Sequence, residues 1–123
     1  MRKMSESEME IMKIVWGHEN PLTNKEIMSY IPSNQWKVTT VLTLISRLID
    51  KGFLKVGKEG RSSLYSYVVS EEEYKTMCSK KFLNEFYEGS FKNFFAALYS
   101  ADEISQSDFD ELREILDKRE DVK

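Results

Sequence analysis

The sequence predicts a mostly α-helical protein with one small β-hairpin, divided into two parts. Residues 5–52 carry apolar side chains at helical spacing in three segments, and residues 54–69 change to the two-residue period of strands. Residues 70–123 return to helical spacing and contain six of the seven phenylalanines. We therefore expect a small domain over residues 1–69 and a helical region over residues 70–123.

Each helix expected before residue 36 begins at a capping box, in which a hydroxyl and a glutamate cap each other's backbone. Ser5 pairs with Glu8 in the first, and Thr23 pairs with Glu26 in the second. The first helix should end at Gly17, and the second should end before Pro32. The side chains expected to face inward are Met9, Met12, Val15, Trp16, Ile27, Tyr30 and Ile31.

The segment 37–51 sorts its side chains onto two faces when it is wound at about 100° per residue. A solvated helix face usually carries long helix formers such as Glu, Lys and Gln. The polar face here consists of Thr39, Thr40, Thr43, Ser46, Arg47, Asp50 and Lys51, and the opposite face of Val38, Val41, Leu42, Leu44, Ile45, Leu48 and Ile49. Short hydroxyls and an arginine suit contact with phosphates and base edges, and threonine methyls suit thymine methyls. The alternative is an ordinary amphipathic helix whose outer face is rich in threonine.

A β-hairpin is expected after Gly52, with strands over 54–58 and 64–69 and a turn over 59–63. Three helices followed by a hairpin is the order of a winged helix-turn-helix domain, whose third helix enters the major groove while the hairpin wing contacts flanking backbone. Arg61, at the expected wing tip, could instead enter the minor groove. The candidate DNA-binding residues are Lys37, Thr39, Thr40, Thr43, Ser46, Arg47, Lys51, Lys58 and Arg61.

The net charge of −3 is unevenly distributed between the two parts. Residues 1–69 carry ten Lys and Arg against seven Asp and Glu, whereas residues 70–123 carry eight against fourteen. A basic first part and an acidic second part indicate that only the first meets a polyanion.

The second part is expected to form three helices. A capping box at Ser70 and Glu73 begins the first, Gly89 ends it, and Ser105 begins the last. A segment this short buries too little surface to form a closed core, so we expect a two-fold symmetric homodimer. The alternative is that its aromatic residues pack onto the winged helix. The expected dimerisation residues are Phe82, Phe86, Phe91, Phe94, Phe95, Leu98, Phe109, Leu112 and Leu116.

Composition argues against several other classes of protein. Neither a membrane-spanning run nor the apolar segment of a signal peptide is present, and the single cysteine, Cys78, fits a reducing cytoplasm. His18 is expected in a turn, and with one histidine and one cysteine we expect no metal site and no cofactor. Runs such as 71–73 place carboxylates at helix starts, where the helix dipole explains them, so we expect no enzyme.

Several stretches resemble the BlaI/MecI family of bacterial repressors. The most specific is the Thr-Thr-Val-x-Thr-x-x-x-Arg-Leu run at 39–48 with Lys-Gly-Phe at 51–53. Residues 4–12, 15–16, 65–67, 88–91 and 110–116 look like the same family, so the resemblance covers nearly the whole chain.

The resemblance implies a homodimeric repressor bound to a palindromic operator and released when a membrane sensor protease of the BlaR/MecR kind cuts its C-terminal region. The best-known members control β-lactamase or penicillin-binding-protein genes, which makes antibiotic resistance one expected role; other relatives control other operons, some linked to copper. Those resistance members carry basic residues where this chain has Thr39 and Leu42. They are cut at an Asn-Phe bond, whereas the corresponding pair here is Ala97 and Leu98.

Two other functions fit the same pattern. One is a winged-helix module that binds proteins without DNA, which the overall acidity favours. The other is a ligand-sensing winged-helix regulator, although no effector pocket is evident in the sequence.

Overall fold

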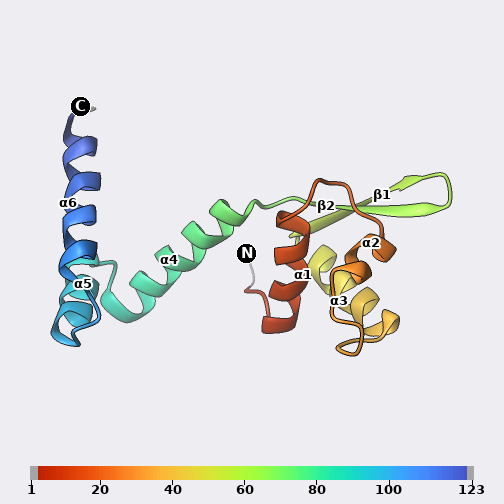
Figure 1. Cartoon of the computed structure of the whole chain (residues 1–123), viewed down its shortest axis with the longest axis horizontal. Coiled ribbons are helices and arrows are strands. Elements are labelled where there is room, and N and C mark those ends of the chain that lie inside the picture. The colour runs from red at the N-terminus through yellow and green to blue at the C-terminus, as the bar shows by residue number, and fades with distance from the viewer. Residues whose placement is uncertain (1–2, 122–123) are drawn as a thin grey trace. The chain divides into compact units, whose positions relative to one another are not determined.

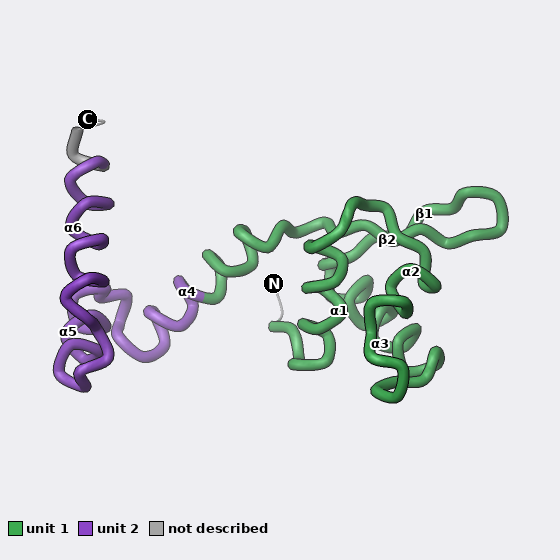
Figure 2. Tube along the Cα trace, viewed as in Figure 1, with its two compact units in different colours: residues 1–78 green, residues 79–123 purple. Residues whose placement is uncertain are grey.

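A computed structural model describes residues 3–121, which form two compact units that divide after Cys78 (Figure 2). The first unit holds helices α1 (Glu6–Trp16), α2 (Asn24–Ser29) and α3 (Val38–Asp50), strands β1 (Leu54–Glu59) and β2 (Ser62–Tyr67), and the start of α4 (Glu71–Tyr87) (Figure 1). The second holds the rest of α4 with α5 (Phe91–Ser100) and α6 (Gln106–Asp121). The predicted fold class, a winged helix-turn-helix followed by C-terminal helices, is confirmed.

The helix starts follow the local chemistry of the sequence. All three predicted capping boxes form, at Ser5 and Glu8, at Thr23 and Glu26, and at Ser70 and Glu73. Each uses one hydroxyl and one carboxylate to bond backbone N–H groups that have no partner within the helix. The helices α1, α2 and α4 therefore begin at the predicted capping boxes, and α3, which has no side-chain cap, also lies close to its predicted bounds.

The core of the first unit lies where α1, α2, α3 and the base of the hairpin meet. Its fully buried side chains include Phe53, Ile11, Met12, Ile27, Ile45, Leu48, Val15 and Val41. One inward prediction is wrong, because Tyr30 is 48% exposed and stacks on the His18 ring, with centroids 3.7 Å apart. Tyr30 is the C-cap of the short helix α2 and lies at the surface, where the His18 ring offers it a flat stacking partner.

The hairpin turn is tighter than expected, and the second strand begins and ends two residues earlier than predicted. β1 pairs antiparallel with β2 from Leu54 opposite Tyr67 to Glu59 opposite Ser62, so only Gly60 and Arg61 form the turn. Gly60 has φ 61°, a conformation that glycine adopts readily. Leu22 extends the sheet through a bridge to Tyr65, with both backbone bonds made at 2.8–2.9 Å. The bridge ties the hairpin base to the segment that leads into α2.

The first turns of α4 belong to the core of the first unit. Tyr74 is 3% exposed, and its ring meets Phe53 edge-on at 5.4 Å and Trp16 at 6.1 Å. Its hydroxyl accepts a hydrogen bond from the Met4 N–H at 3.0 Å, and the Trp16 indole donates to the Val69 carbonyl at 3.0 Å. The start of α4 therefore packs beside α1 and covers that side of the first unit's core.

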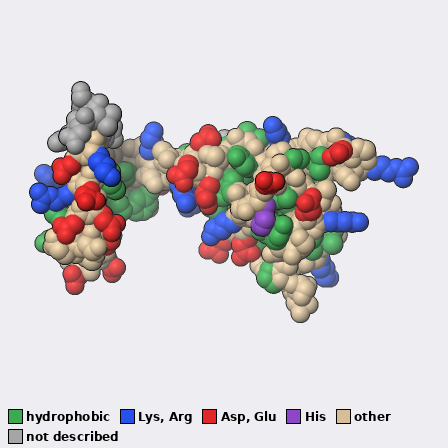
Figure 3. Space-filling view, turned by 45° about the horizontal axis from the view of Figure 1, so that its top comes forward, with side chains coloured by type: hydrophobic (Ala, Val, Ile, Leu, Met, Phe, Trp, Pro, Cys, Tyr) green, Lys and Arg blue, Asp and Glu red, His purple; other side chains and the backbone are tan. Residues whose placement is uncertain are grey.

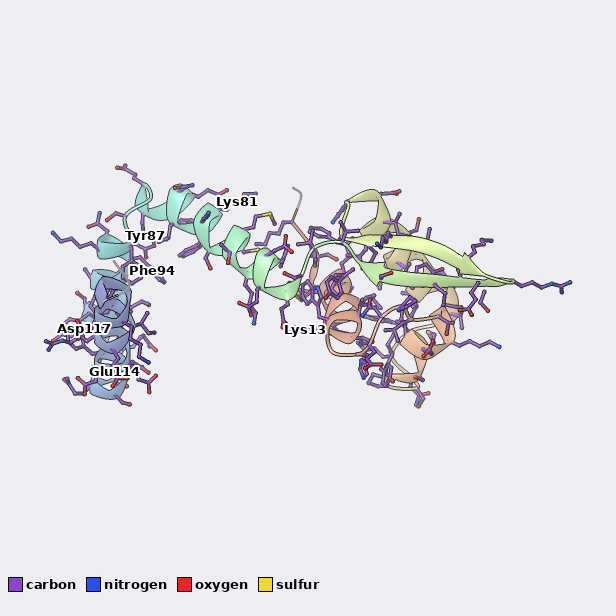
Figure 4. All side chains as sticks on the ribbon, turned by 90° about the horizontal axis from the view of Figure 1, so that it is seen from above. Lys13, Lys81, Tyr87, Phe94, Glu114 and Asp117 are labelled. Carbon is purple, nitrogen blue, oxygen red and sulfur yellow. The ribbon has the colours of Figure 1, made fainter. Side chains whose placement is uncertain are left out.

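The second unit is built from aromatic contacts and leaves much of its apolar surface exposed. Phe94 of α5 meets Phe82 of α4 at 5.7 Å between ring centroids. It also meets Tyr87, at the end of α4, at 5.4 Å (Figure 4). Glu88 and Gly89, with φ 51° and 81°, turn the chain between α4 and α5. No residue of α5 is buried, so the described part of this unit lacks a closed core. None of the helices over residues 3–121 is both long enough and apolar enough to cross a membrane.

Candidate nucleic-acid interface

Helix α3 packs one side into the core of the first unit and exposes the other side. Val41, Leu44, Ile45 and Leu48 are buried, and they lie within one arc of the helix. The six predicted residues Lys37, Thr39, Thr40, Thr43, Ser46 and Arg47 are all exposed. The core thus fixes which side of α3 faces outward, and these six side chains are brought together on it.

The hydroxyls of this face differ in what they can still bond. The Thr43 hydroxyl donates to the Thr39 carbonyl at 2.9 Å within the helix. Its one proton is therefore used, and what Thr43 presents outward is its methyl group and an oxygen that can accept. The Thr39, Thr40 and Ser46 hydroxyls have no such bond among the described contacts.

Two residues assigned to the inner face prove to be exposed. Val38 is 50% exposed and Leu42 is 39% exposed. Seven residues were expected on the inner face, but the elements packed on α3 cover only the narrower arc of its buried residues. The outer face of α3 is consequently wider and more apolar than the sequence indicated.

Lys51 is the predicted DNA-binding residue that the structure turns away from this face. Its Nζ lies 2.5 Å from Glu8 Oε1 and also donates to the Lys3 carbonyl at 3.1 Å. Glu8 is 1% exposed, and the same carboxylate accepts from the Ser5 N–H at 2.8 Å. Burial acts to raise the pKa of Glu8, but the bonds from Lys51 and Ser5 outweigh it and hold the pKa below its ordinary value. The role of Lys51 here is to neutralise a buried carboxylate.

The wing contributes charge and borders a polar hollow. Lys58 and Arg61 are exposed, and Figure 3 shows Lys and Arg side chains projecting at the hairpin end of the first unit. A hollow of about 340 Å³ lies between the start of α2, α3 and β2. It is lined by Thr23, Asn24, Lys25, Leu42, Arg61, Ser62, Ser63 and Tyr65.

Sequence reasoning missed several residues of this hollow. Lys25 stands beside Arg61 and the serines that follow it only because the Leu22–Tyr65 bridge brings β2 against the segment before α2. No local pattern could have identified them, because the two sides of the hollow lie far apart in the sequence. A cation, hydroxyls and an amide around one hollow can accommodate a phosphate of a strand that passes over it.

The predicted dimerisation residues gather in the second unit. Phe82, Phe86, Phe91 and Leu116 are 43%, 67%, 50% and 51% exposed, and the other five are half-buried. An open groove between α5 and α6 is lined by Phe91, Phe94, Phe95, Leu98, Ile104, Asp108, Glu111, Leu112 and Ile115. Ala97 and Leu98, the predicted cleavage pair, lie within helix α5, with Ala97 exposed and Leu98 half-buried.

These features define a class of protein, the winged-helix proteins that use an exposed third helix and a basic wing for nucleic acid. The profile of the Penicillinase repressor family matches residues 4–118. The chain belongs to this family, the BlaI/MecI family of DNA-binding transcriptional repressors, which are not enzymes.

Individual relatives agree with this assignment. The penicillinase repressor of Bacillus licheniformis is 33% identical over 98% of this chain and 94% of its own length. The methicillin resistance regulatory protein MecI of Staphylococcus aureus strain N315 is 32% identical over 95% of each chain. A solution structure of monomeric Bacillus licheniformis BlaI in complex with the blaP half-operator aligns with a TM-score of 0.51 and 32% identity, over 59% of this chain and 89% of that one.

Proposed function

We propose that this chain represses transcription by binding a palindromic operator as a homodimer, with α3 in the major groove and the β1–β2 wing against the flanking backbone. The observation that carries the proposal is the exposed face of α3, where hydroxyls and Arg47 gather while the opposite face is locked into the core. A helix fixed in this way can be presented to base edges without rearrangement. The relative solved in complex with a half-operator supports the binding of operator DNA.

The charged residues divide into groups with different tasks. Lys37 at the start of α3 and Lys58 in the wing are exposed cations that suit phosphates, whose neutralisation makes affinity fall with salt. Arg61 and Lys25 flank the polar hollow, and we assign this hollow to a phosphate between the major-groove and wing contacts. Lys51 is left out of the interface, because its ammonium is bonded to Glu8.

Dimerisation is assigned to the second unit. Side chains as apolar as Phe86 and Ile115 are 67% and 64% exposed there, and burying them against a second copy would stabilise both. A two-fold dimer would bind two half-sites about one helical turn apart, which fits a palindrome.

Release of the operator is assigned to cleavage by a membrane sensor protease of the BlaR/MecR kind within α5. A cut between Ala97 and Leu98 would separate Phe91, Phe94 and Phe95 from Leu98 and α6, although these residues line one groove. Each fragment would then bury too little apolar surface to hold two subunits together. The bond lies inside a helix, so the protease would have to bind a locally unwound α5.

The first test of DNA binding is Arg47→Ala in the full-length chain, measured by gel shift on the promoter region of its own operon. The loss should be about 1–3 kcal/mol if Arg47 contacts a base, and less if it contacts only phosphate. The melting curve should not change, because Arg47 is exposed. Lys75→Met, which removes an exposed lysine of α4, is the matched control and should bind as wild type. Equal affinities of wild type and Arg47→Ala would remove Arg47 from the interface, and salt-independent binding would contradict the proposed function.

A further inference from the structure

We propose that the exposed apolar side chains of α3 make this chain select operators by the 5-methyl groups of thymine in the major groove. The inference rests on the proposed function and names the base feature that its interface recognises. The residues concerned are Val38, Thr39, Leu42 and Thr43, which we call the methyl face.

The methyl face is a continuous surface. Val38 and Leu42 are one turn apart, as are Thr39 and Thr43, so the four side chains lie beside one another along the exposed side of α3. Val38 and Leu42 are 50% and 39% exposed, although both are aliphatic. The other elements of the first unit cover them only in part, while Val41, Ile45 and Leu48 on the same helix are fully buried.

Hydrogen bonding makes this face more apolar than its composition indicates. The Thr43 hydroxyl donates to the Thr39 carbonyl at 2.9 Å, so it has no proton left for a base. Thr43 can still accept a bond, but its outward methyl extends the surface of Leu42 and Val38. A face with so few free donors discriminates poorly between acceptors on base edges.

The surroundings of the methyl face indicate nucleic acid as its occupant. Lys37 precedes it at the start of α3, and Arg47 follows one turn after Thr43. Leu42 also lines the hollow that carries Lys25 and Arg61. An apolar strip between cations suits a duplex groove, where phosphates lie on both sides and thymine C5-methyl groups are the apolar feature of the floor.

The test compares thymine with uracil, which lacks only the 5-methyl group. Full-length protein selects sites from a random-sequence duplex library, and the selected duplexes are then copied with dTTP or with dUTP. We expect thymine-rich half-sites and a loss of about fourfold for each contacted thymine when uracil replaces it, as for one buried methyl-sized group. Leu42→Ala and Val38→Ala should weaken binding to the thymine duplex and bring the thymine-to-uracil ratio toward one.

Arg47→Ala is the matched control, because it should weaken both duplexes equally and leave the ratio unchanged. If the wild type binds both duplexes tightly and equally, the methyl inference is overturned while the proposed function stands. If the library yields no preferred site, both the methyl inference and the proposed function are wrong. If Leu42→Ala lowers the sedimenting mass and leaves the ratio unchanged, a second copy covers this face and the inference is wrong.

Discussion

Replacing Lys51 by methionine should destabilise the first unit because it leaves the Glu8 carboxylate buried without a counter-charge. Glu8 is 1% exposed and receives bonds from Lys51 at 2.5 Å and from the Ser5 N–H at 2.8 Å. Removing one partner of a fully buried pair costs about 3–5 kcal/mol, and the 19% exposure of Lys51 reduces this to about 2–4 kcal/mol. Glu8→Gln should cost less, because the amide can still cap Ser5 and the freed ammonium can reach water.

The pH dependence separates this mechanism from a loss of packing. In the wild type the pKa of Glu8 is lowered on folding, so its contribution is complete above the ordinary glutamate pKa of about 4.3 and is lost as the pH falls through the lower, folded value. In Lys51→Met burial acts without the opposing charge and should raise the pKa of Glu8 instead. The cost of the variant should therefore be largest at pH 7 and should shrink as the pH falls toward 4.

Urea unfolding followed by tryptophan fluorescence measures this cost, because both tryptophans, Trp16 and Trp36, lie in the first unit. Lys75→Met is the matched control, since the Lys75–Glu71 pair is exposed and 4.0 Å long and should cost less than about 0.5 kcal/mol. The double variant Glu8→Gln with Lys51→Met should be nearly as stable as Glu8→Gln alone. A cost for Lys51→Met below about 1 kcal/mol at pH 7, or one independent of pH, would refute the reasoning.

Two further predictions concern the division of the chain. A fragment of residues 1–78 should be monomeric by sedimentation. It should also be more stable than a fragment of residues 1–69, because only the longer fragment keeps Tyr74 against Phe53 and Trp16. Equal stability of the two fragments would contradict the role of Tyr74. An engineered protease site between Ala97 and Leu98, cut in the purified protein, should convert dimers to monomers by light scattering and weaken operator binding, since each half-site would then be bound independently. A cut protein that stays dimeric on its operator would contradict release by proteolysis and favour a small-molecule or redox signal.

The features that sequence reasoning predicted correctly are those determined by near neighbours. The capping boxes at Ser5, Thr23 and Ser70 each join residues three positions apart, so the pattern specifies its own geometry. The position of α3 and the exposure of Arg47 likewise follow from helical periodicity. The family resemblance likewise rested on short continuous stretches of sequence, such as residues 39–48.

The features it missed depend on contacts between distant segments. Val38 and Leu42 are as apolar as their buried neighbours, and only the arrangement of α1, α2 and β1 around α3 determines that they remain partly exposed. The polar hollow joins residues near 23 to residues near 62 through the Leu22–Tyr65 bridge. Winding one segment as an isolated helix shows neither which residues of α3 are covered nor which residues line the hollow.

Lys51 illustrates how a buried charge alters the interpretation of a surface. By periodicity it belongs beside Arg47 and Thr40, and its charge fits a phosphate equally well. Glu8, however, is drawn into the core by the capping box at the start of α1 and needs a cation there. Lys51, the C-cap of α3, provides that cation. The ion pair thus joins the first helix to the end of α3 and engages a cation that could otherwise bind a phosphate. In the proposed complex, this leaves the apolar side chains of α3 a larger share of the contact.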